Sequence, residues 1–225
     1  MIFMKIFLRL SLTAIALMLV FNAFAVSETI AQNPLPEILK RMEINRNSMT
    51  SLRSNITMDK YGSQLGTHDV TEGTFVYLPA KGRDALVRID WTKPIKETLS
   101  VVNKKYVIYT PRRNQAITGN ASDAKGSGKA NNLFAFINMS KDELKANFNI
   151  KYLGEEKIKG DFPTWRLEMT PKNPASYKFK LAEMWVDGNG MPLQIKVTES
   201  NNDTTTILLS NVEKNATIKA PRFSG

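Results

Sequence analysis

Between residues 73 and 111 the chain alternates apolar and polar positions in four short runs. Phe75 and Tyr77 share one face of the first run, and Ile89 and Trp91 share one face of the second. A period of two in segments rich in β-branched and aromatic residues is typical of strands with one buried face. Because only short turn sequences separate the runs, they predict an antiparallel meander. The expected strands cover residues 74–78, 86–91, 98–102 and 106–109.

Similar alternation occurs in residues 52–61 and again from residue 150 to the end of the chain. Asp187-Gly-Asn-Gly190, between two alternating runs, is a strong hairpin signal. Residues 62–72 are expected to form a polar loop, and residues 154–157 a turn after a short strand. The whole pattern predicts about ten or eleven strands, which can bury one face only by curling. The expected fold class is α+β, an incomplete antiparallel β-barrel with helices over its apolar concave face.

Two segments have helical patterns. Residues 36–49 predict an amphipathic helix, and Ser140 with Glu143 forms a capping box that starts a second helix. Small and polar residues at 114–132 predict a mobile loop, followed by an apolar run at 133–139. Such an apolar helical pair on a long tether either plugs the sheet as ordinary core or acts as a lid that admits a hydrophobic ligand. The pattern leaves both interpretations open for the loop and helices at about 112–149.

The first 25 residues have the features of a cleavable signal peptide. Lys5 and Arg9 precede an apolar stretch that ends at Ala23-Phe-Ala25, a small-x-small cleavage site. A membrane anchor is the alternative, but the apolar stretch is short for a bilayer span, which needs about 20 residues. We expect an exported chain cleaved after Ala25, with residues 26–225 as a single domain.

Composition and charge reduce the number of possible functions. The chain has no cysteine, which excludes disulfides and lipid attachment at a cysteine after the leader. The net charge is +10, and it falls to +8 without the leader, which holds two basic residues and no acidic one. Because the basic residues are scattered, no nucleic-acid partner is expected. The charge suits either an ordinary basic surface or one attracted to anionic headgroups or an acidic partner.

The sequence has few motifs that are typical of a catalytic site. His68 is the one histidine, and no nucleophile elbow, phosphate loop or dinucleotide fingerprint accompanies it. We therefore expect no enzyme activity, no catalytic residue, no metal and no cofactor. Large apolar residues are abundant instead, with ten Met, eleven Phe, three Trp and six Tyr. Such residues fill a core or line an irregular apolar cavity equally well.

Residues 38–223 resemble the outer-membrane lipoprotein carriers, the LolA family. The resemblance rests on the order of weak motifs, which are Gly73-Thr-Phe75, Ile89-Asp-Trp91-Thr-Lys-Pro94, Tyr109-Thr-Pro111, Leu167-Glu-Met-Thr-Pro-Lys172 and Trp185-Val-Asp-x-x-Gly-x-Pro192. It implies a monomeric periplasmic carrier with a helical lid over an apolar cavity. Such a carrier takes acylated lipoproteins from an inner-membrane lipoprotein-releasing ABC transporter to an outer-membrane lipoprotein acceptor. A lipoprotein-sensing envelope regulator or a free-lipid shuttle on the same fold is the alternative.

Strand parity and the lid pattern together predict the lipid-binding residues. These are Phe75, Tyr77, Val87, Ile89, Trp91, Leu133, Phe136, Ile137, Trp165, Leu167 and Met169. The resemblance also implies a basic residue that latches the lid from the turn before the Trp strand. Arg83 is the candidate, with Lys81 beside it, although this turn is longer than in the family pattern and its proline comes earlier.

Overall fold

The computed structural model describes residues 33–79, 86–102, 105–120, 136–137 and 139–218. The chain separates into two compact units, residues 1–33 and 34–225, and the features below belong to the second. The predicted signal peptide, Arg83 and Leu133 lie outside the described residues, so their roles stay predictions. None of the described helices has the length and apolar character of a membrane span.

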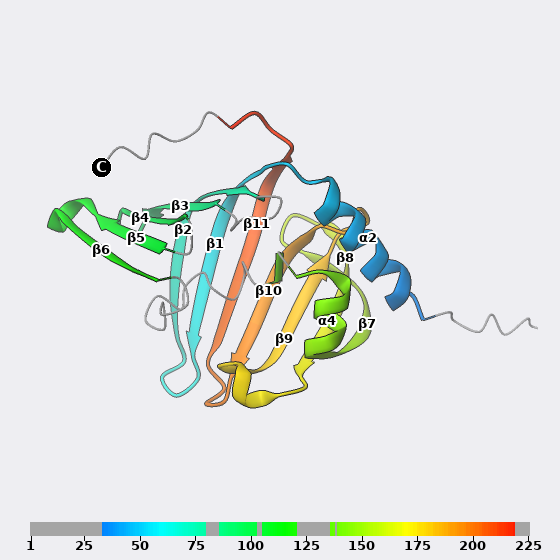
Figure 1. The fold of residues 1–225 in the computed structure, drawn as a ribbon. Coiled ribbons are helices and arrows are strands. Elements are labelled where there is room, and N and C mark those ends of the chain that lie inside the picture. Colours follow the sequence, from blue (N-terminus) through cyan, green and yellow to red (C-terminus); the bar gives the residue numbers. More distant parts are fainter. Residues whose placement is uncertain (1–32, 80–85, 103–104, 121–135, 138, 219–225) are drawn as a thin grey trace, which may run out of the picture. The chain divides into compact units, whose positions relative to one another are not determined.

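Eleven strands form one antiparallel sheet in the order β6-β5-β4-β3-β2-β1-β11-β10-β9-β8-β7 (Figure 1). Their bounds are β1 (Leu52–Gly62), β2 (Thr67–Leu78), β3 (Leu86–Lys93), β4 (Glu97–Val102), β5 (Lys105–Thr110), β6 (Gln115–Asn120), β7 (Phe148–Ile158), β8 (Phe162–Pro171), β9 (Phe179–Val186), β10 (Pro192–Glu199) and β11 (Thr204–Lys214). Pairing of β1 with β11 joins the two meanders. The sheet is open, with β6 and β7 as its edges, which confirms the predicted incomplete barrel.

Two α-helices of the described chain lie over the part of the sheet that contains β7–β10 (Figure 1). The first, α2 (Leu35–Ser48), matches the predicted amphipathic helix. The second, α4 (Lys141–Asn147), begins with the predicted capping box. In that box the backbone N–H of Glu143 donates to Ser140 Oγ at 3.1 Å, and the Ser140 N–H donates to Glu143 Oε2 at 2.7 Å.

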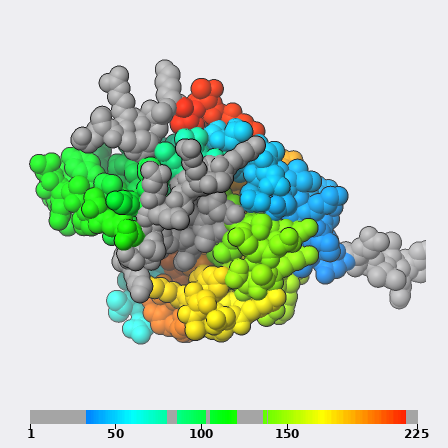
Figure 2. Space-filling model, in the orientation of Figure 1, coloured from blue at the N-terminus to red at the C-terminus, as the bar shows by residue number. Residues whose placement is uncertain are grey.

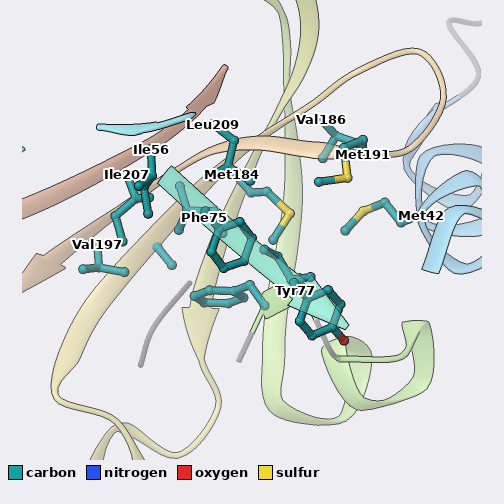
Figure 3. Packing of buried hydrophobic residues seen from close by; sticks show 14 of the residues in the cluster. Met42, Ile56, Phe75, Tyr77, Met184, Val186, Met191, Val197, Ile207 and Leu209 are labelled. Carbon is teal, nitrogen blue, oxygen red and sulfur yellow. The ribbon is translucent and has the colours of Figure 1, made fainter. Parts of the chain in front are cut away.

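The core lies between the sheet and these helices. Alternate residues of every strand except β6 point into it, as the hydrophobic pattern predicts. Figure 3 shows Phe75 and Tyr77 of β2 next to Met184 of β9, with Met42 of α2 facing Met191. All five side chains are buried. The same apolar face therefore continues from strand to strand across the junction of the two meanders.

Strands are longer than the sequence predicts at three places. Only residues 63–66 form the expected loop, and β2 begins at Thr67, which pairs with Gly62. Residues 115–120, expected in a mobile loop, form β6. Both segments are largely exposed on their two faces, so no alternation of apolar and polar residues marks them as strands.

The third difference concerns Gly154, where a turn was predicted. The strand β7 continues through this glycine to Ile158, and the pairing with β8 shifts there. Gly154 has φ +124, a conformation that other residues rarely adopt, and it forms a bulge within the strand. The chain reverses only after Ile158, at Lys159-Gly160-Asp161, where Gly160 and Asp161 have positive φ.

Candidate functional site

The predicted lipid-binding residues on the strands lie on one face because the register places them opposite each other. Phe75 pairs with Ile89, and Tyr77 pairs with Val87 across β2 and β3. On the other half of the sheet the same face carries Leu167. The predicted residues that are buried together in one apolar cluster are Phe75, Tyr77, Val87, Ile89, Trp91, Phe136, Ile137, Leu167 and Met169.

Trp165 lies at the margin of this cluster, against which it packs while partly buried. The guanidinium carbon of Arg41, on α2, lies 5.4 Å from the centroid of the Trp165 ring. This arrangement is a cation–π contact, and it covers the indole where the apolar face meets solvent.

Phe136, in the short helical segment before α4, is held by aromatic rings. Its ring centroid lies 5.5 Å from that of Phe148 and 6.0 Å from that of Phe179. Tyr177 completes the group, 4.9 Å from Phe148. Only 2% of Phe136 is exposed, so this segment is inserted into the apolar face rather than resting on it.

One carboxylate ties the start of α4 to α2. Glu43 Oε2 accepts from the backbone N–H of Lys141 at 2.9 Å, and Glu43 Oε1 accepts from Arg46 at 2.7 Å. The hydrogen bond from Arg46, assisted by that from Lys141, lowers the pKa of Glu43 below its ordinary value. The sequence analysis missed this residue, and its only signal was the pairing of Glu43 with Arg46 three positions later.

The described residues enclose cavities of different sizes. Beneath the helices a cavity of about 10 Å³ is lined by residues that include Met42, Met49, Phe136 and Ile137. That volume holds about one water molecule. A larger cavity of about 560 Å³ is lined by residues of β2–β5, among them Trp91. A third, of about 370 Å³, lies among Ile158, Phe162 and Leu193.

In this conformation the described residues fill the face beneath the helices, and an acyl chain would have to displace some of them. The family model for the outer membrane lipoprotein carrier protein LolA matches residues 59–224. The chain belongs to the LolA family. The match includes β2 to β11 and α4, and therefore most of the apolar face and the segment that covers it. No curated protein matches the chain significantly.

Several solved structures are similar to this LolA family member. The Mycobacterium tuberculosis lipoprotein LppX has 13% identity and a TM-score of 0.48, and the match covers 83% of this chain and 99% of that one. LprF from Mycobacterium bovis has 15% identity and a TM-score of 0.47, with 84% and 98% covered. A LolA superfamily protein from Nitrosomonas europaea has 13% identity and a TM-score of 0.40, with 81% and 94% covered.

The sequence expectations also concern metal-ligating and titratable side chains. Among the described residues no group of three or more His, Cys, Asp or Glu side chains could hold a metal ion. His68 lies in β2 rather than in a loop, and its Nδ1 is 3.0 Å from the Asp59 carboxylate on the exposed part of the β1–β2 hairpin. The Tyr61 ring lies beside this pair, with its centroid 4.9 Å from that of His68.

Proposed function

We propose that the mature chain, from Val26 onward, is a periplasmic carrier that binds the acyl chains of lipoproteins against the concave face of its sheet. The observation that carries this proposal is the buried apolar face, into which Phe136 and Ile137 are inserted as a small, separate plug. An acyl chain has the same chemistry as this plug and replaces it on the same surface. Membership of the LolA family supports the proposal.

The energies favour such an exchange. Removing Phe136 and Ile137 from the face costs about 1.5–3 kcal/mol for each side chain, whereas each buried CH₂ of an acyl chain contributes about 0.8 kcal/mol. A chain that buries roughly ten CH₂ groups therefore gains about 8 kcal/mol, enough to displace both side chains. Because the plug can return, it also assists release, as a carrier requires.

The proposed partners follow from this role. The protein acts as a monomer without catalysis, receives acylated lipoproteins from an inner-membrane lipoprotein-releasing ABC transporter and delivers them to an outer-membrane acceptor. The cargo is bound through its lipid, so the protein part of the cargo stays outside the cavity. A carrier of this kind transfers the bound lipoprotein to isolated outer membranes, whereas a sensor retains it.

The test compares two buried tryptophans that lie on opposite faces of the sheet. Trp91 belongs to the apolar cluster, whereas Trp185 of β9 points to the other face, where the guanidinium carbon of Arg166 lies 5.2 Å from its ring centroid. We expect Trp91→Phe to weaken binding of a diacylated lipopeptide several-fold and Trp185→Phe to leave it unchanged. Calorimetry with the same peptide lacking acyl chains is the reference. Equal affinities of both variants, or equal binding of both peptides, would overturn the proposal.

A further inference from the structure

The 560 Å³ cavity is built on the same face of the sheet as the apolar cluster. Trp91 and Glu97 are directly opposite each other on β3 and β4, so their side chains share that face. Asp69 lies on the same face of β2, two residues before Thr71, which is opposite Met58. The cavity has the size of small-molecule sites, which are about 300–1,000 Å³.

Charges of both signs line this cavity. Asp69 and Glu97 contribute two carboxylates, and Arg112 and Arg113 contribute two guanidinium groups from η2 (Pro111–Arg113). Within the described part of the chain, none of the four side chains forms an ion pair or a hydrogen bond. The cavity therefore presents anionic and cationic groups that do not pair with each other, and together they complement a ligand that carries one charge of each sign.

Glu97 and the two arginines come from neighbouring parts of the sheet. The strands β4 and β5 are neighbours, and Thr98 is opposite Tyr109, so Glu97 lies beside Thr110, just before the arginines. Neighbouring strands are about 4.8 Å apart, so the side chains of Glu97 and an arginine can contact the two ends of one small ligand such as ethanolamine phosphate. Arg is suited to the phosphate by its planar donors, and a carboxylate is suited to the ammonium.

The rest of the cavity wall contains three apolar residues and two threonines, Thr71 and Thr110. Pro94 and Ile95 line it from the β3–β4 turn, and Ile95 is 51% exposed. Trp91 belongs both to this wall and to the buried cluster, where it is 4% exposed. Trp91 therefore places the cavity directly beside the apolar face on which the acyl chains are proposed to bind.

We propose that this cavity binds the zwitterionic headgroup of a glycerophospholipid of the phosphatidylethanolamine type, with the phosphate on Arg112 and Arg113 and the ammonium on Glu97. The inference rests on the proposed function, because the acyl chains occupy the same apolar face. It deepens that function by naming a second cargo class, since the acylated end of a lipoprotein carries no phosphate. The protein then selects phospholipids by headgroup as well as by chain.

The experiment uses monomeric short-chain lipids and calorimetry on the mature protein. Dihexanoyl-phosphatidylethanolamine is expected to bind more tightly than dihexanoyl-phosphatidylglycerol, which has the phosphate without the ammonium, and than dihexanoylglycerol, which has neither. Arg112→Gln with Arg113→Gln should lower the affinity for the phosphatidylethanolamine by roughly threefold to tenfold. Glu97→Gln should weaken the binding of the phosphatidylethanolamine and strengthen the binding of the phosphatidylglycerol. Lys159→Gln, beside the 370 Å³ cavity, is the matched control and should change neither.

The possible outcomes test the headgroup site and the proposed function separately. Equal affinities for the three lipids would overturn headgroup selection, and tighter binding of the phosphatidylglycerol would overturn the role of Glu97. Binding of free ethanolamine phosphate as tight as that of the lipid would show a site for the soluble phosphate instead. If the diacylated lipopeptide binds while the three lipids do not differ, only this inference fails. If neither the lipopeptide nor any lipid binds, the proposed function fails as well.

Discussion

The two helices that cover the apolar face are attached to it in different ways. The helix α2 has 14 residues and meets the β9–β10 turn so closely that a Cβ on Gly190 would lie 2.3 Å from the Arg41 carbonyl carbon. Its Asn45 donates to the Gly190 carbonyl at 3.3 Å and accepts from Lys214 Nζ at 2.6 Å. The helix α4 has seven residues, of which Leu144 alone is buried.

From this difference we expect α2 to act as a fixed wall of the apolar face and α4 as a movable one. A helix of seven residues has little stability of its own, so α4 depends on its tertiary contacts. In Figure 2 the atoms of α2 (blue) and α4 (yellow-green) meet, and the Glu43 carboxylate joins them there. At its other end Lys172 donates from its backbone N–H to the Asn147 carbonyl at 2.9 Å. We infer that α4 and the plug before it open while α2 stays in place.

The largest effect is expected at the fixed wall. Gly190→Ala places a Cβ against the backbone of Arg41 and Met42 at a residue with φ +84. Overpacking and the unfavourable φ should together lower the free energy of unfolding by roughly 3 kcal/mol or more. Urea unfolding measures the loss. Gly188→Ala, in the same turn with open space around its Cβ, is the control and should stay within about 0.5 kcal/mol. Similar losses in both variants would show that α2 is not held by this close approach.

A smaller and local effect is expected at the movable wall. Glu43→Gln removes the charge that joins Arg46 to the Lys141 N–H, which should destabilise the closed position of α4 by about 1 kcal/mol. Hydrogen exchange should then be about fivefold faster at the amides of α4, with little change in the β1 and β11 amides. Glu37→Gln is the matched control, because Glu37 pairs with Arg41 on α2 at 2.9 Å, away from α4. Equal acceleration by both variants would contradict the role of Glu43.

How much of this could be predicted from the sequence depends on whether a segment has one buried face. The strands that carry Phe75, Ile89 and Leu167 alternate apolar and polar residues, so their inward faces were predictable from parity alone. The segments at 67–71 and 115–120 are exposed on both faces, and no hydrophobic period marks them. Gly154 was misinterpreted for a different reason, since a glycine in a strand signals a turn and a bulge equally.

The tie between the helices was beyond reach of the sequence. Glu43 and Lys141 are 98 residues apart, and the donor is a backbone N–H that every non-proline residue carries. No complementary pair of side chains therefore marks the contact. The sequence likewise does not show that the charged residues of the cavity lie near one another. Asp69, Glu97 and Arg112 belong to separate strands and turns, and only the strand register brings them to one end of the sheet.

The smallest effect is expected on lowering the pH. It should distinguish α4, the movable wall, from α2, the fixed wall. The Ser140 backbone N–H lowers the pKa of Glu143, and Arg46 lowers that of Glu43, in each case from an ordinary value near 4.5. The pKa of Glu143 is lowered only while the capping box of α4 is formed, and the part of the lowering at Glu43 that comes from the Lys141 N–H is present only while α4 is in place. Their stabilisation of α4 is therefore complete above pH 4.5, and it is lost as the pH falls below 4.5 through the lowered pKa values.

The amide resonances of Ser140 and Lys141 should shift in this pH range, while the Asn45 side-chain amide on α2 stays constant. Glu43→Gln combined with Glu143→Gln should remove the pH dependence of α4, and an unchanged titration in that double variant would mean that other groups control the movable wall.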